Sequence, residues 1–73
     1  MDMSVHHHQP DDIADEVRHW LAREFASSMA ESAVSEIVRS AHADLEGQVG
    51  PDAMGETLHR LARFRVLRTL GGR

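Results

Sequence analysis

Hydrophobic side chains recur at helical spacing in three separate stretches of this 73-residue chain. The first stretch has large apolar residues three or four positions apart, namely Ile13, Val17, Trp20 and Leu21. At about 100° per residue these side chains share one face, which predicts an amphipathic helix near residues 12–26. Phe25 falls at the edge of the same face.

The second stretch has a longer apolar stripe, formed by Ala30, Val34, Ile37, Val38, Ala41 and Leu45. Its spacing predicts a helix near residues 29–46. Ser28 and Glu31 have the S-x-x-E spacing in which each side chain accepts a hydrogen bond from a free amide at a helix start. Gly47 follows the stripe and suits the left-handed residue that ends many helices.

The third stretch begins near Pro51, which suits the first position of a helix, and it predicts a helix near residues 52–70. Three amphipathic helices with short connections predict an all-α fold, a small three-helix bundle over residues 11–70. Residues 1–10 have no periodicity, and we expect a disordered, His-containing tail there. We expect a disordered end over residues 71–73.

The third predicted helix is apolar on more than one side. A core-facing side carries Met54, Leu58, Leu61 and Ala62. Phe64 and Leu67 lie a third of a turn or more away, and Val66 and Leu70 lie toward the rear. Such a helix is central in a larger bundle or presents its second side to a partner. Alternatively, Phe64 and Leu67 wrap around the end of the first helix and complete a monomeric core.

Size and composition restrict the function. The chain of 73 residues contains no cysteine, which excludes disulfides, a thiolate nucleophile, Cys-containing zinc sites and iron–sulfur clusters. A chain this short buries too little surface for both a full enzyme scaffold and a deep ligand pocket. In so small a domain, burial and conformational entropy nearly cancel unless disulfides, a metal or association adds stability. We therefore expect a non-enzymatic protein without a cofactor that is stabilised by self-association.

The charges are unevenly distributed, within a formal net charge of −4. All 12 acidic residues precede residue 60, whereas five arginines lie in residues 60–73. A basic end on an acidic chain can pair with a second copy, with the chain's own helices or with an anion such as nucleic acid. The simplest interpretation is a solvated helix whose arginines also favour its C-terminal dipole.

Other chemical motifs are weak. His19, His42 and His59 fall one in each predicted helix, without the i, i+4 spacing that a metal-binding helix requires, so no metal site is predicted. The run His6–His8 is a natural tail or the remnant of a purification sequence. No glycine-rich phosphate loop occurs, and the serines suit capping and helix-surface roles. With no membrane-length apolar run and an acidic, His-rich start, we expect a cytoplasmic protein.

The second and third stretches together match a longer pattern. It comprises Val34, Ile37, Val38, Ala41, His42 and Leu45, then Leu58, Leu61, Ala62, Arg63, Arg65, Arg68 and Leu70. This pattern resembles a family of small bacterial three-helix-bundle dimerisation domains, found alone or fused N-terminally to low-molecular-weight tyrosine-phosphatase-like and arsenate-reductase-like proteins. The resemblance implies a dimer, with a phosphatase-like enzyme as a further candidate partner. It implies no catalysis, because that chemistry needs a cysteine nucleophile.

We therefore predict a homodimerisation module. Its expected interface anchors are Leu61, Phe64, Leu67 and Leu70, and its expected rim charges or anion contacts are Arg60, Arg63 and Arg68. The alternative is a small nucleic-acid-binding regulator that uses the same arginines, which the acidic remainder of the chain disfavours. A third possibility, one member of a stress or toxin–antitoxin pair, has no sequence feature of its own.

Overall fold

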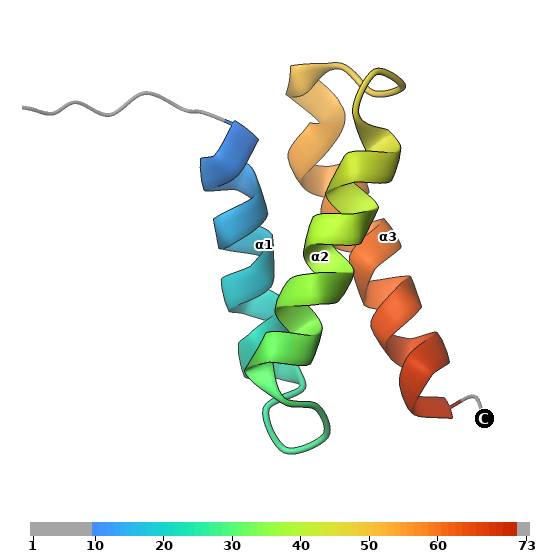
Figure 1. Cartoon of the computed structure of the whole chain (residues 1–73). Helices are drawn as coiled ribbons and strands as arrows, with labels where there is room; N and C mark the ends of the chain where they lie inside the picture. The colour runs from blue at the N-terminus through green and yellow to red at the C-terminus, as the bar shows by residue number, and fades with distance from the viewer. Residues whose placement is uncertain (1–9, 72–73) are drawn as a thin grey trace, which may run out of the picture.

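The computed structural model describes residues 10–71, which form three α-helices connected by short loops (Figure 1). The helices are α1 (Pro10–Glu24), α2 (Glu31–Leu45) and α3 (Pro51–Gly71), and each packs against both others. The predicted all-α three-helix bundle is confirmed. The predicted disordered segments lie outside the described residues, apart from Pro10 and Gly71, which are the terminal residues of α1 and α3.

The start of α2 differs from the prediction. Its N-cap is Ala30, which has an extended backbone and makes no capping side-chain hydrogen bond, so the expected capping box of Ser28 and Glu31 does not form. The backbone amides of Ser28 and Met29 both donate to the Phe25 carbonyl at 2.9 Å, which continues the turn after α1. The backbone therefore becomes extended only at Ala30, and Glu31 is the first residue of α2.

The connection between α2 and α3 follows the prediction closely. Gly47 has a φ of 83°, in the left-handed region that glycine adopts without steric cost. The amides of Gln48 and Val49 donate to the carbonyl of Leu45 at 2.9 and 3.1 Å, so this backbone acceptor at the helix end is satisfied. Pro51 is the first residue of α3, where its missing N–H costs nothing.

The core is one cluster with contributions from all three helices. Its buried members are Val17, Leu21, Phe25, Val34, Val38, Ala41, Met54, Leu58, Ala62 and Val66. Steps of four residues dominate, as in the row 54, 58, 62 and 66 of α3. Four residues make one helical turn plus about 40°, so each successive buried residue lies about 40° further around the helix axis. The buried side of a straight helix therefore rotates gradually along its length.

This drift corrects two predictions. Val66, expected toward the rear of its helix, is fully buried at 0% exposure, because the row of buried residues on α3 turns toward it. Trp20, expected on the core face of the first helix, is 57% exposed. The buried residues of α1 are Val17, Leu21 and Phe25, and Trp20 lies beside them in an open surface hollow that His59 of α3 also lines.

Candidate interaction surface on the third helix

The outer side of α3 carries a row of exposed hydrophobic side chains. Phe64 is 55% exposed, Leu67 43% and Leu70 41%. Residues three apart on a helix are neighbours about 5–6 Å apart at Cβ, so the three form one continuous row. We call this row the α3 stripe. Leu61, which was predicted with them, is only partly buried but packs against the core cluster, so it does not belong to the stripe.

Arg68 borders the α3 stripe. Its guanidinium carbon lies 5.8 Å from the centre of the Phe64 ring, within the range of a cation–π interaction. No carboxylate of the described residues lies within ion-pair distance of Arg68.

Arg63 is paired with α1. Two of its guanidinium nitrogens, Nε and Nη2, lie 2.8 Å from Oε2 of Glu24, and the guanidinium also lies 5.9 Å from the centre of the Phe25 ring. The hydrogen bond from Arg63 lowers the pKa of Glu24; partial desolvation opposes this, and the charges of Arg63 and His59 add to it. The same hydrogen bond raises the pKa of Arg63. This pair joins the C-terminal end of α1 to α3.

Two more arginines of α3 have partners in the same chain. Nη2 of Arg65 lies 2.8 Å from Oδ2 of Asp44 on α2. Nη2 of Arg60 lies 3.1 Å from Oε2 of Glu56, one turn earlier on α3, and both of these side chains are almost fully exposed. Three of the four described arginines of α3 are therefore ion-paired within the chain.

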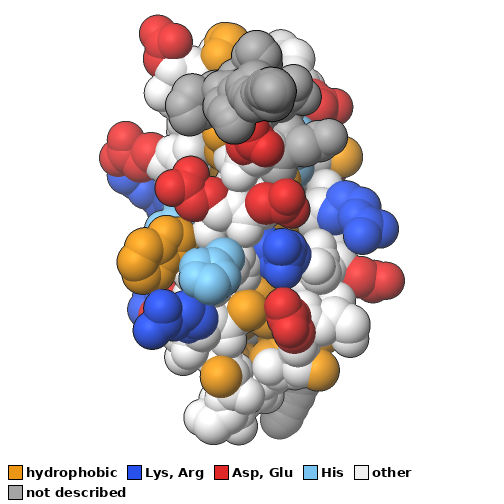
Figure 2. All heavy atoms as spheres, turned by 90° about the vertical axis from the view of Figure 1, so that its left-hand side faces the viewer, with side chains coloured by type: hydrophobic (Ala, Val, Ile, Leu, Met, Phe, Trp, Pro, Cys, Tyr) orange, Lys and Arg blue, Asp and Glu red, His pale blue; other side chains and the backbone are white. Residues whose placement is uncertain are grey.

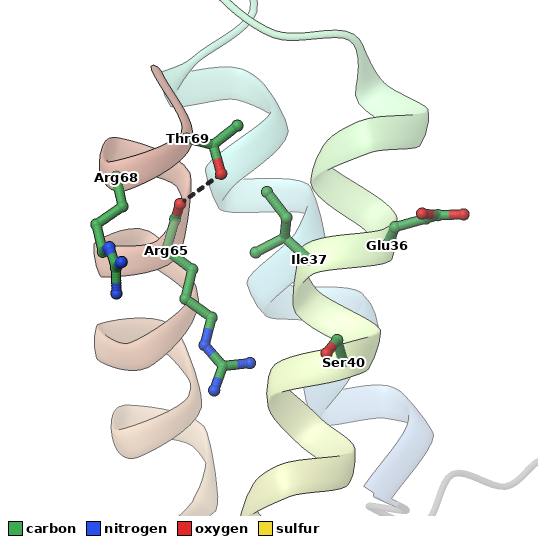
Figure 3. A pocket seen from close by; sticks show the side chains of 6 residues that line it. All are labelled: Glu36, Ile37, Ser40, Arg65, Arg68 and Thr69. Carbon is green, nitrogen blue, oxygen red and sulfur yellow. Dashed lines mark hydrogen bonds between the residues drawn. The ribbon is translucent and has the colours of Figure 1, made fainter. Parts of the chain in front are cut away.

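An open groove of about 530 Å³ runs between α2 and α3 (Figure 3). Arg65 reaches across it from α3 toward α2, Arg68 lines the groove from α3 as well, and Glu36 points away from it. The Thr69 hydroxyl donates to the carbonyl of Arg65 at 2.9 Å. Arg65 is bound to Asp44 and Thr69 to its own helix, so Arg68 is the one arginine of this groove without a carboxylate partner among the described residues.

The α1 face has a different character. Figure 2 shows acidic and basic side chains interspersed over this face, with the hydrophobic ones in small separate areas. Trp20 is its large exposed hydrophobic residue, in a shallow hollow with Arg23, Glu24 and His59. A single exposed aromatic residue among charges is ordinary for a protein surface, whereas a continuous apolar row is not.

His42 is the one described residue with a buried side-chain nitrogen that lacks a hydrogen-bond partner. Its side chain is 12% exposed between α1 and α2; Nε2 is unpaired, and Nδ1 lies 4.0 Å from Oε2 of Glu46. Within residues 10–71, no three His, Asp or Glu side chains come close enough to hold a metal ion. None of the three helices is long and apolar enough to cross a membrane.

Comparisons with known proteins gave no match to any family model, any curated protein or any solved structure. The resemblance to bacterial dimerisation domains therefore stays a prediction.

Proposed function

We propose that this chain is a non-enzymatic homodimerisation module and that two copies meet through the outer face of α3. The observation that carries the proposal is the α3 stripe, in which Phe64, Leu67 and Leu70 are 41–55% exposed side by side. The bundle already has a closed core from all three helices, so no element of the described chain remains to cover the stripe. A second copy would cover it.

The exposed fractions set the scale of the interaction. Full burial of a Leu or Phe side chain contributes about 1.5–3 kcal/mol. With exposures of 55%, 43% and 41%, the three side chains contribute about 3 kcal/mol per copy, or about 6 kcal/mol per dimer. Association costs roughly 4–15 kcal/mol, so these three side chains alone support only a weak dimer, and the stems of the flanking arginines must contribute the remaining stabilisation.

The arginines favour a protein partner over nucleic acid. Arg60, Arg63 and Arg65 each have a carboxylate partner within the chain, and Arg68 alone of the described arginines on α3 has none. The affinity of a protein for nucleic acid increases with the number of phosphates that its lysines and arginines can neutralise. Three of these four arginines are already ion-paired within the chain, which leaves Arg68 as the unpaired cationic group of α3 among the described residues and disfavours a phosphate backbone as the partner.

Sedimentation equilibrium of the full chain, from about 10 μM to the highest soluble concentration, tests the proposal. We expect a reversible monomer–dimer equilibrium. Phe64→Glu should shift it to monomer without loss of helical circular dichroism. Trp20→Glu is the matched control, because Trp20 is equally exposed, at 57%, but lies on α1, and it should leave the equilibrium unchanged.

Two kinds of outcome would overturn this proposed function. One is a monomer at every concentration, or a dimer that Phe64→Glu does not affect. The other is binding of labelled duplex or single-stranded nucleic acid in fluorescence anisotropy, provided that it weakens steeply with salt and is lost when Arg60, Arg63 and Arg68 become Ala. That result would establish the nucleic-acid-binding alternative.

A further inference from the structure

A pocket on the α1–α2 side of the bundle takes no part in the proposed dimer contact. Its volume of about 330 Å³ is at the lower end of the range of about 300–1,000 Å³ that is usual for small-molecule sites. The residues that line it come from α1 and α2 alone. Its polar side chains are Asp15 and Arg18 of α1 and Ser35, Arg39 and His42 of α2. A second copy that packs on the outer face of α3 therefore leaves the pocket open.

Three polar side chains of this pocket lie on one face of α2. Ser35, Arg39 and His42 occupy positions i, i+4 and i+7, which share a face at about 100° per residue. Within residues 10–71, Arg39 has no ion pair and the Ser35 hydroxyl has no hydrogen bond. Nε2 of His42 is the buried nitrogen that lacks a partner. The chain's own groups therefore leave all three side chains with unused hydrogen-bonding capacity.

The other charges of the pocket are already paired with one another. Nη2 of Arg18 lies 3.6 Å from Oδ1 of Asp15, and Nη1 of Arg18 lies 3.2 Å from Oε2 of Glu31. The two carboxylates are 70% and 71% exposed, so water and salt screen their remaining charge. The groups that remain free, a guanidinium and a hydroxyl, both donate hydrogen bonds. Their complement is a negatively charged group with acceptor oxygens.

We infer that this pocket binds a small oxyanion, the carboxylate or phosphate group of a small molecule, through the guanidinium of Arg39 and the hydroxyl of Ser35. The planar guanidinium presents two parallel N–H donors to two oxygens of such a group. Ser35 lies one turn earlier on the same face, about 5–6 Å away at Cβ, so its hydroxyl donates to an oxygen of the same group. Neither side chain has to leave a partner in the described chain to do so.

His42 provides an independent indication that a group is missing at this place. The large majority of buried side-chain polar atoms in folded proteins bond to protein or to ordered water, so an unpaired one needs an explanation. The imidazole of His42 lines the pocket one turn beyond Arg39, although Nε2 itself is closed to solvent. A turn of the ring toward a bound oxyanion would give Nε2 an acceptor and remove the cost of leaving it unpaired.

Nuclear magnetic resonance of the full ¹⁵N-labelled chain tests the site. Sodium phosphate and sodium acetate are titrated separately, at fixed pH and with sodium chloride to hold the ionic strength constant. We expect saturable shifts at millimolar concentrations in the amide signals of residues 35–42 and in the ring signals of His42. Tighter binding of phosphate would identify a phosphate group as the ligand chemistry, and tighter binding of acetate would identify a carboxylate.

Substitutions in the pocket test the two direct contacts. Arg39→Gln should weaken binding about tenfold or more, because it removes the charge-assisted hydrogen bonds. Ser35→Ala should weaken it about threefold to tenfold without loss of stability, since alanine is the better helix former. Arg23→Gln is the matched control and should bind as the original chain does. Arg23 is exposed and has no ion pair within the described part of the chain, but it does not line this pocket.

Two results would overturn the site. One is a set of shifts that does not saturate, which would show adventitious contact with salt only. The other is saturable binding that Arg39→Gln leaves unchanged, which would place the ion elsewhere on the protein. Neither result bears on the homodimer, because the pocket lies on α1 and α2 and the α3 stripe lies on α3. Sedimentation equilibrium of Arg39→Gln should therefore match that of the original chain.

Discussion

Replacement of Gly55 by Ala should stabilise the protein, and the structure gives the size of the effect. Gly55 lies inside α3, where glycine costs about 1 kcal/mol relative to alanine. A Cβ built on Gly55 would lie 3.8 Å from Cγ2 of Ile13 on α1, an ordinary van der Waals contact that requires no movement. The methyl group would also be partly buried between the two helices, which adds a few tenths of a kcal/mol.

The expected gain in the free energy of unfolding is therefore about 1–1.5 kcal/mol. In a domain of this size, that corresponds to a rise in melting temperature of roughly 4–10 °C. Thermal and urea unfolding followed by circular dichroism would measure both quantities. Each variant must be compared at the same protein concentration, because association adds to the apparent stability.

Gly47→Ala is the matched control. No atom outside its chain neighbours lies within 4 Å of a Cβ at Gly47, but its φ of 83° is strained for alanine, so this variant should lose about 1–2 kcal/mol. Replacement of glycine by alanine is thus expected to raise the free energy of unfolding at residue 55 and to lower it at residue 47. If Gly55→Ala were destabilising, α1 and α3 would have to be closer at Ile13 than the structure places them. If it had no effect, the start of α3 would not be a stable helix.

Two further results are expected from the core and from the ion pairs. Leu58→Ala should cost about 2–5 kcal/mol in urea unfolding and Leu70→Ala less than about 1 kcal/mol, because Leu58 is fully buried and Leu70 is 41% exposed; equal losses would contradict the core described above. Because the folded-state pKa of Glu24 is lowered from its ordinary 4.5, its ion pair with Arg63 stabilises the fold above that pH and is lost as the pH falls through the folded-state pKa. The urea midpoint should therefore fall less steeply below about pH 4.5 in Arg63→Ala than in the original chain, and identical pH profiles would contradict this.

Local features of the chain were predictable because their causes are local. The left-handed residue at Gly47 and the helix start at Pro51 follow from the backbone chemistry of single residues. The end of the first helix was harder to predict. There, hydrogen bonds to the Phe25 carbonyl compete with the capping pattern of Ser28 and Glu31, and the sequence contains both possibilities.

The positions of Trp20 and Val66 show a different limit. Periodicity places a side chain on a helix face to within about 40°, but the neighbouring helices decide which edge of that face is covered. Trp20 lies at an uncovered edge and Val66 at a covered one. The exposure of Phe64 and Leu67 is more easily predicted, because the third helix is apolar on more than one side. The side that faces the core cannot hold all of its large apolar residues.

The ion pairs could not be predicted from the sequence, and they change the meaning of its charge distribution. Arg63 and Glu24 are 39 residues apart, and Arg65 and Asp44 are 21 apart, so the basic end of the chain folds back onto its acidic body. A polyanion that bound to α3 would have to compete with these carboxylates, whereas a second copy could pack against the α3 stripe and leave both pairs intact. Folding thus pairs most of the described arginines of α3 with carboxylates of the same chain and leaves an exposed apolar row between them, which is why we propose a protein partner.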